Sequence, residues 1–94
     1  MIVWTEQATR QLDQVQDFIS LSNSPEVSLN VVFQILASVE QLARFPMLGR
    51  RGRVAGSRDL IIPNTPFIVA YTLEDNRIAI LAVYHGSQQW PEAF

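Results

Sequence analysis

The sequence contains no cysteine, no lysine and no apolar run long enough to cross a membrane, and it contains one histidine. The absence of cysteine excludes disulfides, thiolate zinc sites and cysteine catalysis. A lone histidine, His85, is too little for a metal site without several carboxylates, so we expect no metal and no cofactor. A bilayer span needs about 20 apolar residues, and the start of the chain lacks the basic and apolar regions of a signal peptide. We therefore expect a cytoplasmic protein without a membrane segment.

The length and composition predict one folded domain over residues 1–94. Hydrophobic residues make up 48% of the chain and charged residues 17%, which excludes a disordered chain. The mean hydropathy of +0.10 is high for so small a domain. It indicates that part of the apolar surface is kept for a partner.

The basic residues are unevenly distributed. All seven cations are arginine, whereas the net charge is −2, so the chain has no general attraction to nucleic acid. Arginine without lysine favours planar, bidentate contacts with carboxylates or phosphates. Two interpretations remain open for the cluster: it binds a target, or it consists of solvated loop charges paired with acids of the same chain. Its members are Arg44, Arg50, Arg51, Arg53 and Arg58.

Two helices are predicted in the first half of the chain. Apolar residues recur at helical spacing over Thr5–Leu21, with Thr5 as the N-cap. Ser24 as N-cap and Pro25 at the first helical position start a second helix, which ends near Phe45. The apolar stripe of the second helix, which we assign to the core, is Val32, Ile35, Leu36, Val39 and Leu42.

Strands are predicted on either side of these helices. They cover Ile2–Trp4, Arg58–Ile62, Phe67–Leu73 and Arg77–His85, and the glycine-containing segment 47–57 is predicted to be a loop. The order β-α-α-β-β-β predicts an α+β fold in which a helical hairpin packs on a small, mostly antiparallel sheet. The second face of the sheet is expected to be exposed beside the arginines.

Alternation along Arg77–His85 makes a further prediction about the faces of the last strand. It places Ile80, Ala82 and Tyr84 on one face and Leu81, Val83 and His85 on the other. Tyr84 and His85 could then enter one site only if a bulge intervened.

Groups of residues along the whole chain carry a family resemblance. They are Trp4-Thr5-x-x-Ala8, Phe45-Pro46-x-x-Gly49-Arg50-x-Gly52-Arg53, Arg58-Asp59-Leu60, Pro66-Phe67-Ile68-Val69-x-Tyr71 and Val83-x-His85-Gly86-x-Gln88-x-Trp90-Pro91. Together they resemble toxins of the RelE/ParE superfamily, most closely the ParE branch. The resemblance implies the β-α-α-β-β-β fold of that superfamily and a growth-inhibiting toxin of a type II toxin–antitoxin pair, neutralised by a small antitoxin protein.

The resemblance leaves two activities open. RelE-like members are mRNA endoribonucleases that cut messages on the ribosome, whereas ParE-like members bind DNA gyrase and block it without hydrolysis. A nuclease needs proton-transfer groups and cations for the phosphate, and the candidate catalytic residues here are His85 and Tyr84. The other interpretation of His85 is a strand-end residue with a structural hydrogen bond.

The arginines favour one of these activities without excluding the other. Where some RelE-like nucleases carry a carboxylate, this chain has Arg50-Arg51-Gly52-Arg53. Nucleases of this type that rely instead on clusters of lysine and arginine are also a poor match, because the chain has no lysine. We therefore favour gyrase binding, with the ribosome-dependent nuclease and an inactive relative that keeps only antitoxin binding as alternatives. Trp90 is either a partner-binding anchor or an aromatic residue that closes the core. The target- or phosphate-binding residues are predicted to be Arg50, Arg51, Arg53 and Arg58.

Overall fold

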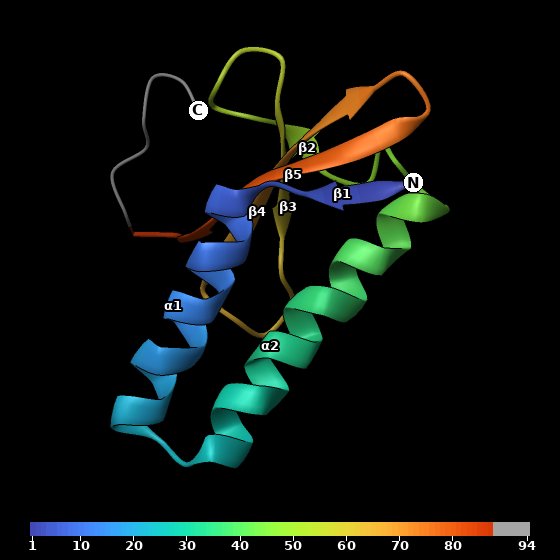
Figure 1. Ribbon diagram of the computed structural model, residues 1–94. Coiled ribbons are helices and arrows are strands. Elements are labelled where there is room, and N and C mark those ends of the chain that lie inside the picture. Colours follow the sequence, from blue (N-terminus) through green and yellow to red (C-terminus); the bar gives the residue numbers. More distant parts are fainter. Residues whose placement is uncertain (88–94) are drawn as a thin grey trace.

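A helical hairpin covers one face of a five-stranded sheet in the computed structural model, which describes residues 1–87 (Figure 1). The sheet has the order β1-β5-β4-β3-β2, in which β1 runs parallel to β5 and the other neighbours are antiparallel. This confirms the predicted α+β fold. The elements are β1 (Ile2–Trp4), α1 (Glu6–Ser22), α2 (Pro25–Glu40), η1 (Gln41–Ala43), β2 (Arg50–Arg51), β3 (Arg58–Ile61), β4 (Phe67–Glu74) and β5 (Arg77–His85).

Both helices begin at the predicted caps. The Thr5 hydroxyl accepts a hydrogen bond from the Ala8 N–H at 3.1 Å, and the Ser24 hydroxyl accepts one from the Val27 N–H at 3.3 Å. Each bond satisfies an amide that the first helical turn would otherwise leave unpaired. Thr5 also donates its hydroxyl to the Leu81 carbonyl at 3.3 Å, so the cap of α1 is attached to β5.

The core lies between the hairpin and the helix-side face of the sheet. Ile35, Val39 and Leu42 are at most 1% exposed, as their apolar spacing predicts. Val32 and Leu36 are half-buried at the edge of the same stripe. The sheet contributes Leu60, Ile62, Phe67, Val69, Tyr71, Ile78, Ile80 and Val83 to this cluster.

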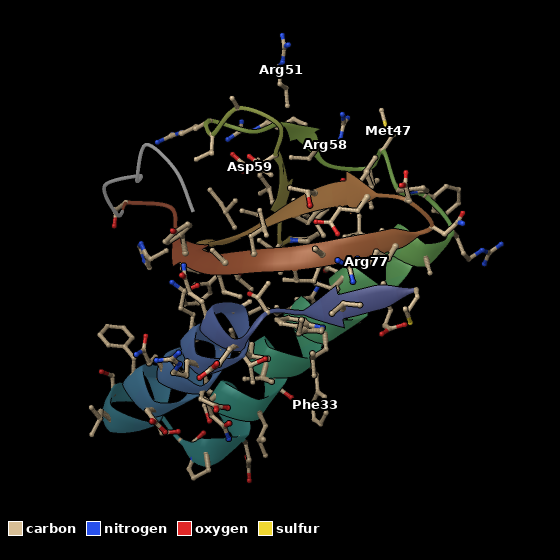
Figure 2. The ribbon with its side chains drawn as sticks, turned by 45° about the horizontal axis from the view of Figure 1, so that its top comes forward. Phe33, Met47, Arg51, Arg58, Asp59 and Arg77 are labelled. Atoms are coloured by element: carbon tan, nitrogen blue, oxygen red, sulfur yellow. The ribbon has the colours of Figure 1, made fainter. Side chains whose placement is uncertain are left out.

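The second face of the sheet is also buried, so the expectation that it is exposed is wrong. Ile68, Ala70, Ala79, Ala82 and Tyr84 are each at most 8% exposed. Segment 52–57 lies on this side of the sheet, opposite the helices (Figure 2). The segment folds back on itself, with Val54 and Ser57 buried and Arg53, Ala55 and Gly56 exposed.

A β-bulge changes the faces of β5. Tyr71 pairs with Ile80 whereas Ala70 pairs with Ala82, so Leu81 is an extra residue in the last strand. Ile80 and Val83 therefore both belong to the helix-side core, and Ala82 and Tyr84 form a cluster on the other side with Ala70. The predicted grouping of Ile80 with Ala82 and Tyr84 is wrong because simple alternation does not cross a bulge.

Candidate functional site

The arginine loop, residues 50–58, is a closed turn of the backbone. The Gly52 N–H donates to the Ser57 carbonyl at 2.8 Å, and the Ser57 hydroxyl donates to the Val54 carbonyl at 2.7 Å. A Cβ at Gly52 would lie 2.8 Å from the Ser57 carbonyl oxygen and would overlap the Ser57 hydroxyl, so this close approach requires glycine. Val54, only 8% exposed, anchors the turn.

Three arginines of this loop are exposed: Arg50, Arg51 and Arg53. Arg51 projects away from the body of the protein (Figure 2). Within residues 1–87, the ion pairs join Arg10 to Glu6 and Arg77 to Glu74, both far from the loop in sequence. Arg50 and Arg51 thus form no ion pair with an acidic residue in the described part of the chain, and they can bind an acidic partner.

Arg58 is positioned differently from the other three. Its Nε donates to the Gly49 carbonyl at 2.9 Å and its Nη2 donates to the Met47 carbonyl at 3.2 Å. It does not turn toward Asp59, because consecutive residues of a strand face opposite sides. Arg58 therefore stabilises the backbone that leads into the arginine loop.

Replacing Arg58 with alanine should lower stability as well as toxicity. Two charge-assisted bonds to carbonyls are lost, one of them at the buried Gly49, and we expect a loss of about 1.5–3 kcal/mol in the free energy of unfolding. Thermal melts measure this. Arg77→Ala is the matched control, since its exposed pair with Glu74 should contribute at most about 0.5 kcal/mol. An Arg58→Ala protein as stable as Arg77→Ala would contradict this role.

Tyr71 bonds to the backbone segment between Pro46 and Gly49, next to the carbonyls that Arg58 binds. Its side chain is fully buried, its hydroxyl donates to the Pro46 carbonyl at 2.9 Å, and it accepts from the Gly49 N–H at 2.8 Å. Sequence reasoning missed this role, because nothing local to Tyr71 predicts a partner 25 residues away. The tyrosine fixes the segment through which α2 connects to β2.

Asp59 is an unexpected buried charge beneath the arginine loop. Its exposed fraction is 1%, and neither carboxyl oxygen has a hydrogen-bond partner of ordinary geometry within residues 1–87. Burial raises the pKa of Asp59 above its ordinary value of 3.8. The Arg53 backbone amide and the charges of Arg50 and Arg53 oppose this rise, but burial dominates.

His85 lies at the end of β5, in a small cavity away from the arginine loop. Its Nδ1 accepts from the Ser87 N–H at 3.1 Å and lies 2.7 Å from the Ser87 hydroxyl oxygen, so the proton of the neutral ring is assigned to Nε2. The ring also packs edge-on against Phe67, with centroids 5.6 Å apart. The cavity measures about 420 Å³ and is lined by Gln11, Gln14, Val15, Phe18, Phe67, Val83, His85 and Ser87.

Tyr84 lies on the opposite face from His85. The bulge precedes both residues, so it does not bring them together. Burial raises the pKa of Tyr84 above 10.0, and a hydrogen bond with the Gln11 side chain opposes the rise. A cavity of about 510 Å³ beside Arg51, Arg53 and Arg58 contains neither residue.

The candidate catalytic side chains and the arginine loop lie in different parts of the described structure. Within the described residues, no arginine lines the cavity of His85, and the two candidate catalytic side chains face opposite sides. Residues 1–87 also contain no group of three or more acidic or histidine side chains that could hold a metal ion, and none of their helices could span a membrane. Trp90, the predicted partner anchor, lies outside the described residues.

Comparison with known proteins identifies the family. The family model described as the ParE toxin of the type II toxin–antitoxin system parDE matches residues 2–90. The chain belongs to the ParE toxin family. The ParE branch indicated by the sequence is therefore confirmed, and so is the toxin class.

Two similar proteins, from Sinorhizobium fredii and P. aeruginosa, agree with this assignment to the ParE family. The chain is 36% identical over 91 residues to the protein named "Putative toxin Y4kP" of Sinorhizobium fredii, an alignment that covers 97% of this chain and 93% of the relative. A solved structure, titled as a chromosomal ParDE TA system from P. aeruginosa, matches with a TM-score of 0.82 and 28% identity. It covers 89% of this chain and 92% of the other. As a type II toxin, the ParE-family chain has a cognate antitoxin as its partner.

Proposed function

We propose that this ParE-family toxin arrests growth by binding DNA gyrase in the cytoplasm through its arginine loop, without a chemical step of its own. One observation carries the proposal: exposed arginines are grouped on the arginine loop, whereas His85 lies in a separate cavity with Nδ1 engaged by Ser87. A binding toxin needs the first feature alone, while a nuclease needs both in one site.

The chemistry of the loop also favours a protein target. A chain with net charge −2 lacks the long-range attraction that supplies most non-specific affinity for RNA. A local group of guanidinium ions is sufficient to bind carboxylates on an acidic protein surface. Arg50, Arg51 and Arg53 are the residues that we assign to this contact.

Purified toxin should inhibit supercoiling by purified gyrase and should leave ribosome-bound messages intact. The same preparation is tested in both assays, so that an inactive sample gives no effect in either. Cleavage of messages in the ribosomal A site, with supercoiling unaffected, would establish the nuclease instead. Loss of both activities in folded protein would leave antitoxin binding as the remaining function.

Replacing His85 with glutamine should leave growth inhibition nearly unchanged. Glutamine keeps a polar side chain at the end of β5 but cannot exchange a proton near neutral pH. If His85 were a general acid or base, the rate of cleavage should fall about 10²–10⁴-fold. Growth curves after induction measure the effect, with immunoblots confirming equal amounts of soluble protein.

A further inference from the structure

The side chain of Asp59, a residue of β3, lies between the sheet and the arginine loop. Its neighbour Leu60 belongs to the helix-side core, so alternation along β3 turns Asp59 to the other face. There it pairs with Ala70 of β4 on one side and with Arg50 of β2 on the other. Figure 2 shows the side chain beneath the loop, on the side away from the helices.

Burial outweighs the groups that favour the charged form of this carboxyl. The Arg53 backbone amide and the charges of Arg50 and Arg53 favour the ionised carboxyl, but burial still raises its pKa. Within residues 1–87, Tyr84 of β5 is a titratable group on this face, and alternation along β4 places Glu74 and its partner Arg77 at the far end of the same face. A cavity lined by Asp59 and Leu60 is also lined by neutral residues of α2, Gln34 and Ser38, and by Gln41 of η1.

A buried charge acts on its surroundings more strongly than an exposed one. Solvent and salt screen exposed charges, whereas the field of a buried carboxylate is screened much less. Arg50 and Arg53 lie in this field, and their side chains are exposed where a partner can reach them. The carboxylate therefore offsets part of the positive potential that the loop presents.

We propose that Asp59 lowers the affinity of Arg50 and Arg53 for the carboxylates of an acidic protein surface. The inference rests on the proposal that the arginine loop is the contact surface of the toxin, and it adds the residue that sets the strength of the contact. Asp59 acts through the two arginines and does not itself touch the partner, since it is buried.

The test compares two variants that change net charge equally. Asp59→Asn removes the buried charge and keeps the shape of the side chain, and Asp75→Asn removes an exposed charge in the turn between β4 and β5. The probe is a short dextran sulfate, measured by titration calorimetry at fixed salt. We expect Asp59→Asn to bind it about three- to tenfold more tightly than wild type, and Asp75→Asn to differ by less than about twofold.

The pH dependence separates an electrostatic role from a structural one. Protonation of Asp59 removes its charge, so the wild-type affinity should rise as the pH falls through the raised pKa of Asp59. The sulfates of the probe stay ionised, and both proteins retain His85, so the difference between the wild-type and Asp59→Asn profiles reports on Asp59. The profiles should converge at acid pH.

Stability provides an independent control. Because the folded state raises the pKa of Asp59, the stability that this group contributes is fully present below 3.8 and is lost as the pH rises through the folded pKa. Asp59→Asn should therefore melt at or above the wild-type temperature at neutral pH. Tighter binding in this variant would then not reflect a loosened fold.

Equal affinities of Asp59→Asn and Asp75→Asn, or weaker binding by Asp59→Asn, would overturn the inference. If Asp59→Asn does not fold, the pH dependence of probe binding is measured on the His85→Gln protein instead. An affinity for dextran sulfate that does not rise as the pH falls would then overturn the inference. Gyrase inhibition is measured on the same proteins. If the variants bind dextran sulfate as expected but the wild-type protein does not inhibit gyrase, the gyrase proposal alone is wrong. If both variants inhibit gyrase with equal potency and bind the probe with unchanged affinity, this inference alone is wrong.

Discussion

Replacing Arg51 and Arg53 together with alanine should abolish growth inhibition while leaving the melting temperature close to that of wild type. Both side chains are exposed on a loop whose shape depends on other residues, so the stability change should stay within about 0.5 kcal/mol. Each lost charge-assisted contact should reduce target affinity about ten- to a hundredfold. For two independent contacts the expected reduction is about 10²–10⁴-fold.

The measurement combines a growth assay with thermal melts and gyrase binding. Arg10→Ala is the matched control, because it removes an exposed arginine of α1 whose partner is Glu6 at 3.0 Å. The double variant should lose toxicity and the control should keep it. A folded double variant that inhibits growth like wild type would show that the target is contacted elsewhere.

Replacing Tyr71 with phenylalanine should lower stability strongly, although the change removes only one oxygen atom. The ring still fills the core, but the Pro46 carbonyl and the buried Gly49 N–H lose their partner. An unsatisfied buried group costs about 1–3 kcal/mol. In a domain of this size that corresponds to a fall in melting temperature of about 5–20 °C.

Thr72→Val is the matched control for this change. It also removes one hydroxyl from β4, but the Thr72 hydroxyl is buried and has no hydrogen-bond partner within residues 1–87. Its removal should be neutral or stabilising. If Tyr71→Phe melted at the same temperature as Thr72→Val, the two bonds of Tyr71 would not contribute to stability.

The parts of the fold that depend on neighbouring residues could be predicted from the sequence. Helix starts are local events, since a cap and the amide that it satisfies are three residues apart, and Thr5 and Ser24 were identified on that basis. The bulge at Leu81 is not local. The neighbouring residues Ala70 and Tyr71 of β4 pair with residues of β5 that are two positions apart. The alternation of residues within β5 alone does not predict this pairing.

The candidate site shows the same division. Spacing and residue type were sufficient to single out the arginines, but not to separate Arg58, which holds the Gly49 and Met47 carbonyls, from Arg51, which projects into solvent. The two-residue strand β2 was missed because its pairing with β3 depends on how the loop closes. The burial of Asp59 was not predicted, because a strand position does not reveal that a carboxyl is buried without a hydrogen-bond partner among residues 1–87.

The pairing of the first strand with the last one controls when this toxin can finish folding. Met1 and Thr5 bond to Ile78 and Ile80 of β5, and the Thr5 hydroxyl reaches Leu81, 76 residues later in the chain. At about 5–20 residues per second, a ribosome needs about 4–15 s to synthesise that separation. In the later part of that interval, after α2 and η1 have been synthesised, the nascent helical hairpin exposes the apolar stripe that the sheet will later cover. The growing chain is therefore a candidate for chaperone capture before it is a toxin.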